Sequence, residues 1–92
     1  MKNLYKETYQ FYSEQYRFII GNKYANPKMR VKCLKELGTD IQEWKELNAE
    51  AEAESPMVWR QVCTLQHFVE KDKNINQSII DRSKASIRKA LS

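Results

Sequence analysis

The 92-residue chain contains few of the residues that break helices or cross-link small domains. It has two glycines, two prolines, two cysteines and one histidine. So little glycine and proline excludes collagen-like and Gly/Pro-rich disordered chains, and two cysteines are too few for a disulfide scaffold. A chain of this length supports one hydrophobic core and no second one. We therefore expect residues 1–92 to form a single folded domain.

Long hydrophobic runs are absent as well. No apolar run exceeds three residues, as in residues 18–20, whereas a transmembrane helix needs about 20. The first residues mix lysine and glutamate with apolar side chains, which does not match the apolar centre of a secretory signal. We expect no membrane association and a cytoplasmic location. In that reducing compartment Cys33 and Cys63 are expected to be free thiols packed as small apolar groups.

Apolar residues instead recur at helical spacing through most of the chain. A first helix is predicted over residues 4–20 and ends at Gly21, which tolerates the left-handed conformation typical of helix ends. Asn26, followed by proline, predicts the cap and start of a second helix. The phase of this helix continues across Gly38, where glycine favours a kink or a short break as an alternative to a straight helix. The Ala/Glu stretch at 49–54 is expected to be its solvated end.

A second cap-and-proline pair, Ser55 and Pro56, predicts the start of a third helix. The polar run at 70–74 interrupts its apolar pattern, so we expect a break there and a fourth helix over 75–91. A single helix from Pro56 onward is the alternative, because no glycine or proline intervenes. No segment alternates as a strand does. The predicted fold is all-α, a compact antiparallel bundle of three or four helices joined by short connections.

The first helix carries more large apolar side chains than one core requires. Its apolar rows cover roughly 200° of the circumference, against about 100° for a helix that packs on one core. We expect Leu4, Phe11 and Phe18 to face inward and the tyrosines to contact another protein, since tyrosine is enriched at interfaces. The alternative is that bulky residues simply fill a small core. The predicted protein-binding residues are Tyr5, Tyr9, Tyr12, Tyr16 and Trp59.

The net charge of +4 at pH 7 is unevenly distributed. Residues 1–36 carry eight basic and three acidic side chains, residues 37–54 one basic and six acidic, and residues 55–92 seven basic and three acidic. The chain is therefore polarised into basic, acidic and basic blocks. Such a distribution can steer charged partners or favour contact between copies of the chain.

Within the first block, Lys28, Lys32 and Lys35 share one side of the predicted second helix. A basic stripe of this kind can bind phosphate groups, although lysines on helices are often only solvated. Tyr24 is available to stack on a base. The predicted nucleic-acid-binding residues are Lys23, Tyr24, Lys28, Arg30, Lys32 and Lys35.

The sequence contains no arrangement typical of catalysis. Cys63 and His67 are four residues apart, a spacing at which a thiol and an imidazole can share a metal or form a nucleophile and its base. A zinc site would need two further ligands, and the chain has no second histidine. Asp40 and Glu43 lie in a stretch expected to be solvated and unsuited to acid–base catalysis. We expect no enzyme activity, no cofactor and no metal site.

These observations predict one function and leave two alternatives open. We expect a non-enzymatic protein-binding module, an adaptor or an inhibitor, that acts through the aromatic face of its first helix and forms a homo-oligomer. The first alternative is a nucleic-acid-binding protein that uses the basic stripe. The second is an immunity-type or anti-defence protein that neutralises one toxin or nuclease, and identification of the partner would separate it from the main prediction.

Overall fold

A computed structural model describes the backbone of residues 2–91 and the side chains of residues 4–91. This part of the chain contains no strand. The helices are α1 (Lys2–Gly21), α2 (Pro27–Leu47), the short α3 (Ala51–Glu54) and α4 (Pro56–Leu91). The predicted all-α class is confirmed. None of the described helices is long and apolar enough to cross a membrane.

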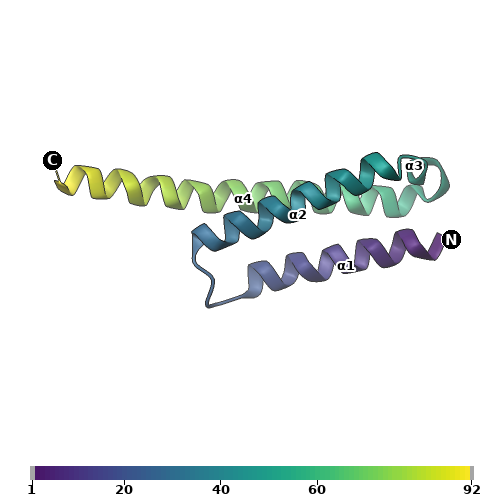
Figure 1. Cartoon of the computed structure of the whole chain (residues 1–92), viewed down its shortest axis with the longest axis horizontal. Helices are drawn as coiled ribbons and strands as arrows, with labels where there is room; N and C mark the ends of the chain where they lie inside the picture. The colour runs from purple at the N-terminus through teal and green to yellow at the C-terminus, as the bar shows by residue number, and fades with distance from the viewer. Residues whose placement is uncertain (1, 92) are drawn as a thin grey trace.

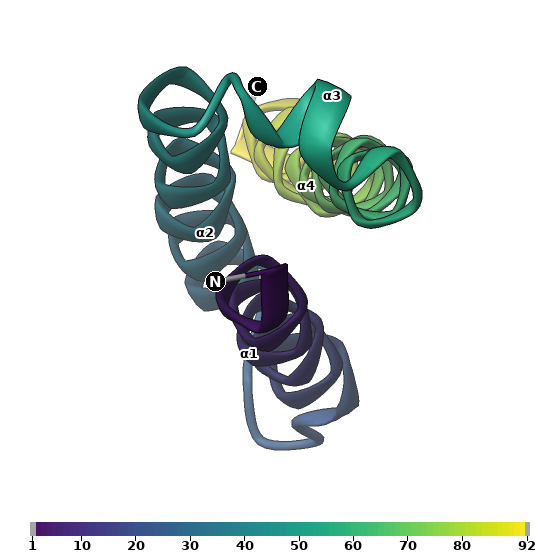
Figure 2. The ribbon, with the colours of Figure 1, turned by 90° about the vertical axis from the view of Figure 1, so that its right-hand side faces the viewer.

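The three long helices form an up-down-up bundle (Figure 1). α2 runs antiparallel to α1 and to α4, and the end-on view places the three helices at the corners of a triangle (Figure 2). The contact of α2 with α4 is by far the largest, and α1 packs on both with smaller contacts. The short connections, residues 22–26 and 48–55, produce this antiparallel order, as predicted.

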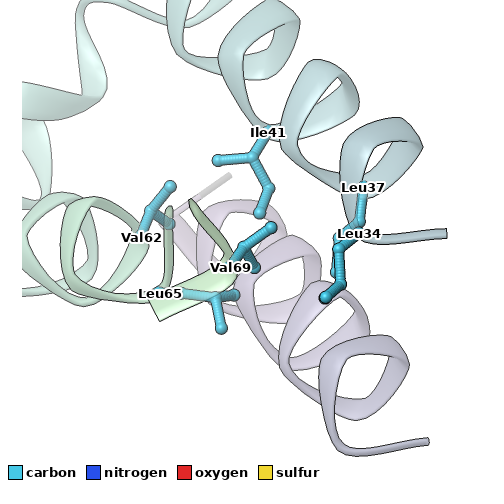
Figure 3. Packing of buried hydrophobic residues seen from close by; sticks show 6 residues of the cluster. All are labelled: Leu34, Leu37, Ile41, Val62, Leu65 and Val69. Atoms are coloured by element: carbon cyan, nitrogen blue, oxygen red, sulfur yellow. The ribbon is translucent and has the colours of Figure 1, made fainter. Parts of the chain in front are cut away.

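The hydrophobic core lies between α2 and α4 (Figure 3). Its six side chains are at most 6% exposed, and they follow the helical spacing that places apolar residues on one face. They are Leu34, Leu37 and Ile41 from α2 and Val62, Leu65 and Val69 from α4. All six belong to the stripes that the sequence pattern indicates. Further partly buried side chains pack around them, namely Tyr9, Tyr12, Tyr16, Ile19, Trp44 and Val58.

The turn between α1 and α2 is made by asparagines. α1 ends at Gly21 as predicted, but this glycine does not adopt the left-handed conformation. The side-chain oxygen of Asn22 instead accepts the backbone N–H of Tyr24 at 3.0 Å, a local turn typical of asparagine. Asn26 then caps α2, since its side-chain oxygen accepts the N–H of Met29 at 2.8 Å. The predicted cap of α2 is confirmed.

α2 continues through Gly38 without the short break that we considered. The hydroxyl of Thr39 donates to the carbonyl of Lys35 at 3.0 Å, the pattern of a helix interior and not of a new cap. A Cβ atom on Gly38 would lie 3.6 Å from Cγ1 of Val69. The glycine therefore lies where α2 approaches α4 closely.

The end of α2 differs from the expected solvated helix end at 49–54. The backbone N–H of Asn48 makes the last helical bond, to the carbonyl of Trp44, and its side-chain amide donates to the same carbonyl, at 2.9 Å each. The helix ends after Leu47. The chain then turns and forms α3, in which Ala51 is fully buried. The prediction was wrong here because asparagine competes with the helix for backbone carbonyls and a small alanine lets α3 pack on α4.

The predicted break at 70–74 is also wrong, and the alternative of one continuous helix is confirmed. The polar residues of this run support the helix from within. Glu70 and Lys73 form an ion pair at 3.0 Å, one turn apart on the helix. A polar run without glycine or proline ends the apolar stripe but not the helix.

α4 is so long that it extends beyond its partners (Figure 1). Beyond Asn76, which is buried, only Ile80 is half-buried and all other side chains up to Leu91 are exposed. We call residues 77–91 the α4 overhang. The described chain measures 59 × 22 × 16 Å, so the predicted compactness applies to the three-helix part and not to the overhang.

Candidate protein-binding surface

The tyrosines of α1 face the bundle. Tyr9, Tyr12 and Tyr16 pack against the core between α2 and α4. Leu4, Phe11 and Phe18, which share the other flank of α1, are all more than half exposed. The expected orientation of this helix is therefore wrong, and α1 is rotated so that its Leu/Phe flank faces outward.

Acidic partners of the phenol groups explain this rotation. The hydroxyl of Tyr5 donates to Glu54 at 3.0 Å and lies 3.4 Å from Glu50. The hydroxyl of Tyr16 donates to Asp72 on α4. A tyrosine can cover the core with its ring while its hydroxyl reaches a carboxylate at the edge, and a phenylalanine at the same position would leave that carboxylate without the bond. The tyrosine flank therefore fits the bundle better than the Leu/Phe flank.

These phenols are held in their neutral form. The hydrogen bond to Glu54 is the main reason that the pKa of Tyr5 is raised to about 12. Burial, and then the hydrogen bond to Asp72, raise the pKa of Tyr16 to about 12. Burial, with the nearby charges of Asp40 and Glu43, raises the pKa of Tyr12. Near neutral pH the three phenols keep their protons, and those of Tyr5 and Tyr16 are donated to carboxylates.

Trp59 is part of an aromatic cluster inside the bundle. The rings of Tyr5 and Trp44 meet edge to face with centroids 6.0 Å apart, and the rings of Trp44 and Trp59 are 6.2 Å apart. The ammonium group of Lys45 lies 5.4 Å from the centre of the Trp59 ring, within the range of a cation–π contact. This cluster joins α1, α2 and α4. Trp59 and the tyrosines are thus at least partly occupied by contacts within the chain, and their role as partner anchors stays a prediction.

A groove between α1 and α2 opens beside the Leu/Phe flank. Its volume is about 590 Å³, and Phe11 and Phe18 line it with exposed fractions of 56% and 74%. The apolar lining is completed by Ile19, Cys33 and Leu37, and the acidic edge consists of Glu14, Glu36 and Asp40. We call this the α1–α2 groove. It joins an apolar floor to an edge of negative charge.

A second groove lies on the opposite side of α1, between α1 and α4. It is smaller, about 360 Å³, and is lined by Tyr9, Tyr16, Leu65 and Phe68 among others. Its charged residues are Arg17 and Arg60. The two grooves beside α1 therefore have edges of opposite charge, negative towards α2 and positive towards α4.

The α4 overhang carries an apolar stripe with no helix against it. Ile80, Ile87 and Leu91 follow the spacing of one helix face, which continues the core face of α4. Lys84 and Arg88, both exposed, flank the same face. The segment contains four basic residues and one acidic residue. It has the sequence pattern of a basic amphipathic helix.

The predicted nucleic-acid-binding residues are mostly exposed, with one exception. Lys23, Lys28, Lys32 and Lys35 are exposed, and Tyr24 is 96% exposed beside the first of them. Arg30 is half-buried, and its Nη2 donates to the backbone carbonyl of Asn22 at 3.0 Å. Nε of Arg30 is buried without a hydrogen-bond partner. Arg30 therefore supports the turn between α1 and α2, and the lysines form the solvent-facing stripe.

Residues 2–91 contain no group of three or more His, Cys, Asp or Glu side chains placed to hold a metal ion. Cys33 and Cys63 are both free thiols. Cys33 is exposed, so it is not packed as the small apolar group that we expected. Cys63 is half-buried on α4, one turn before the exposed His67.

No known protein family matches the chain, no curated protein is significantly similar to it in sequence, and no solved structure is significantly similar to it in fold.

The sequence pattern indicated the excess of apolar surface on α1 but not the side on which it lies. The acidic block at 37–54 is the sequence feature that could have indicated which flank of α1 faces the bundle. Two of its carboxylates accept hydrogen bonds from Tyr5, at the end of the bundle where α1 begins. The apolar stripe of the overhang was visible as the row Ile80, Ile87 and Leu91, but the predicted break placed it in a separate helix that could pack back on the bundle.

Proposed function

We propose that the protein is a non-enzymatic protein-binding module, an adaptor or an inhibitor, that associates with itself through the outward flank of α1 and the α1–α2 groove. The observation that carries this proposal is the exposure of Phe11 and Phe18 over an apolar groove. Monomeric proteins rarely expose contiguous apolar patches without a binding role. Phenylalanine is also among the residues enriched at protein interfaces.

The charge around the groove supports a specific partner. Glu14, Glu36 and Asp40 line its edge, so a partner surface that joins apolar side chains to basic ones fits it best. Charged edges add selectivity and speed to association, while the apolar centre supplies most of the affinity. We place this association in the cytoplasm, the compartment predicted from the sequence.

The mass in solution tests the proposal. We expect light scattering to give a concentration-dependent mass above the 11.0 kDa of one chain. Phe11→Ser with Phe18→Ser should return the mass to that of one chain, because each substitution removes an apolar ring that would be buried on binding. Leu47→Ser is the matched control, since Leu47 is 80% exposed at the end of α2 and lies outside the groove. This control should behave as the unchanged chain does.

Two results together would contradict the proposal. One is a mass of a single chain at every concentration. The other is a pull-down from the native host in which the unchanged chain and the Phe11→Ser, Phe18→Ser variant capture the same proteins in the same amounts. Circular dichroism of the variant should show unchanged helix content, because both rings are more than half exposed and the core does not depend on them.

Nucleic-acid binding is the second candidate, favoured by four exposed lysines and by Tyr24, which is 96% exposed next to Lys23. A gel shift with single-stranded nucleic acid tests it. Binding through phosphates should weaken steeply with salt, and Lys28→Glu with Lys32→Glu should weaken it further. Arg30→Glu is not a suitable variant, because Arg30 supports the turn between α1 and α2. Affinity that does not depend on salt would contradict this mechanism.

A further inference from the structure

We infer that the α1–α2 groove binds the α4 overhang of a second copy of this chain. This inference rests on the proposed function and names the partner segment. The overhang is a helix whose apolar stripe is exposed beyond the half-buried Ile80, and Phe11, Phe18, Ile19 and Leu37 give the groove an apolar lining. An amphipathic helix placed in an apolar groove is a common mode of protein recognition.

The spacing of the apolar residues matches on the two surfaces. Ile80 and Ile87 are seven residues apart on the overhang, and Phe11 and Phe18 are seven residues apart on α1. Seven residues of helix advance about 10 Å. Two helices that lie side by side in the groove therefore bring apolar side chains to the same intervals along their length.

The charges match as well. Lys84 and Arg88 flank the apolar stripe of the overhang four residues apart, and Glu36 and Asp40 are four residues apart at the edge of the groove. All four side chains are exposed. The α1–α4 groove does not fit the overhang equally well, because its charged residues are arginines and like charges oppose contact.

A second copy is needed because the overhang cannot reach the groove of its own chain. It is the straight continuation of α4 and leads away from the bundle (Figure 1). The contact joins two different surfaces, so it closes into a dimer if two copies exchange overhangs, or continues as a chain of copies if they do not. In both cases each copy supplies one groove and one overhang.

A mixing experiment tests which surfaces meet. Ile87→Asp impairs the overhang and leaves the groove intact, while Phe18→Asp impairs the groove and leaves the overhang intact. Each variant alone should have the mass of one chain. Mixed in equal amounts they should form a 1:1 complex, because one supplies an intact groove and the other an intact overhang. Ile87 and Phe18 are both exposed in the single chain, so we expect both variants to fold.

A charge exchange tests the pairing. Glu36→Lys with Asp40→Lys should weaken association roughly tenfold or more, as expected for like charges in contact. Adding Lys84→Glu and Arg88→Glu to the same chain should restore it, at an unchanged net charge. Arg82→Glu is the control, because Arg82 lies two residues from Ile80 and so on the far side of the overhang. This control should associate as the unchanged chain does.

The outcomes separate this inference from the proposed function. If Phe18→Asp prevents association and Ile87→Asp does not, the α1 face binds something other than the overhang, and the inference is wrong while the proposed function stands. The same holds if the charge exchange fails to restore association. If the unchanged chain is a single copy at every concentration, the inference is wrong, and the pull-down described above decides the proposed function. Formation of the mixed complex together with restored association supports both.

Discussion

Single hydroxyl groups decide which side of α1 faces the bundle. A tyrosine and a phenylalanine have similar rings, but phenylalanine is the more hydrophobic, so hydrophobicity alone would turn the Leu/Phe flank inward. The difference lies in the hydrogen bonds from Tyr5 to Glu54 and from Tyr16 to Asp72. The bond from Tyr16 is partly buried, whereas the bond from Tyr5 is exposed to water and is therefore screened more strongly.

Tyr16 should make the stability of the protein sensitive to alkaline pH. Its pKa is about 12 in the folded chain and about 10 when unfolded. Below pH 10 the phenol is neutral in both states and its stabilisation is complete. Between about pH 10 and 12 the unfolded chain loses this proton more readily, so stability should fall as the pH rises.

Tyr16→Phe tests this origin of the pH dependence. We expect it to lower the free energy of unfolding at pH 7 by about 1 kcal/mol through loss of the bond to Asp72. The decrease between pH 10 and 12 should then be shallower than in the unchanged chain, since one titrating group is gone. Urea unfolding followed by circular dichroism at several pH values measures both effects. Tyr24→Phe, at a 96% exposed position, should change neither, and an equal slope in the Tyr16 variant would contradict this account.

Helix boundaries depended on backbone hydrogen bonds more than on hydrophobic pattern. Asn26 begins α2 where a capping residue precedes proline, and the sequence sufficed to locate it. At the other end of α2, the side-chain amide of Asn48 competes for the carbonyl of Trp44 where the helix stops. The alternating Ala/Glu stretch after it concealed this end. α4 passes through its polar run because no glycine or proline interrupts the helix there. The run still lies within the bundle, where Asp72 accepts from Tyr16 of α1.

Gly38 provides a test of the packing between α2 and α4. Gly38→Ala should raise the free energy of unfolding by about 0.5–1 kcal/mol, since alanine is the better helix former. The added Cβ would lie 3.6 Å from Val69, an ordinary van der Waals contact. Gly38→Pro, by contrast, should destabilise the protein by about 3 kcal/mol because proline breaks a helix interior. Chemical unfolding measures the stability of both variants. Loss of stability in the alanine variant would show that α2 and α4 approach each other more closely than the 3.6 Å contact indicates.

The molecule as a whole is more extended than its length requires. A compact chain of 92 residues has a radius of gyration of about 12 Å, whereas the Cα atoms of this chain give 16.3 Å. The overhang accounts for the difference, because it adds length without adding contacts. A helical segment that extends beyond its bundle gains little stability from helix propensity alone, because packing supplies most of the stability of a helix. This agrees with a partner that packs on the apolar face of the overhang.

Small-angle X-ray scattering can measure this shape in a chain that cannot associate. The Phe18→Asp variant at low concentration should give a radius of gyration of at least 16 Å, as the described chain does. A value near 12 Å would mean that the overhang folds back on its own bundle, which would also remove the basis for its binding to a second copy. The unchanged chain should give larger values as the concentration rises.

The sequence by itself determined the all-α class, the cap of α2 and the helical spacing of the apolar side chains, because each depends on local propensity or on periodicity within one segment. It did not determine which of these apolar positions are buried, since Met29 and Leu47 have the same spacing and are exposed. Tertiary structure alone decided the rotation of α1 and the length of α4 beyond the bundle. The first depends on carboxylates of α3 and α4 that meet the tyrosine hydroxyls only when the helices pack. The second depends on where α2 begins relative to α4, because the two helices are antiparallel. Both features depend on contacts between segments that are distant in the sequence. The periodicity of a single segment therefore cannot predict them.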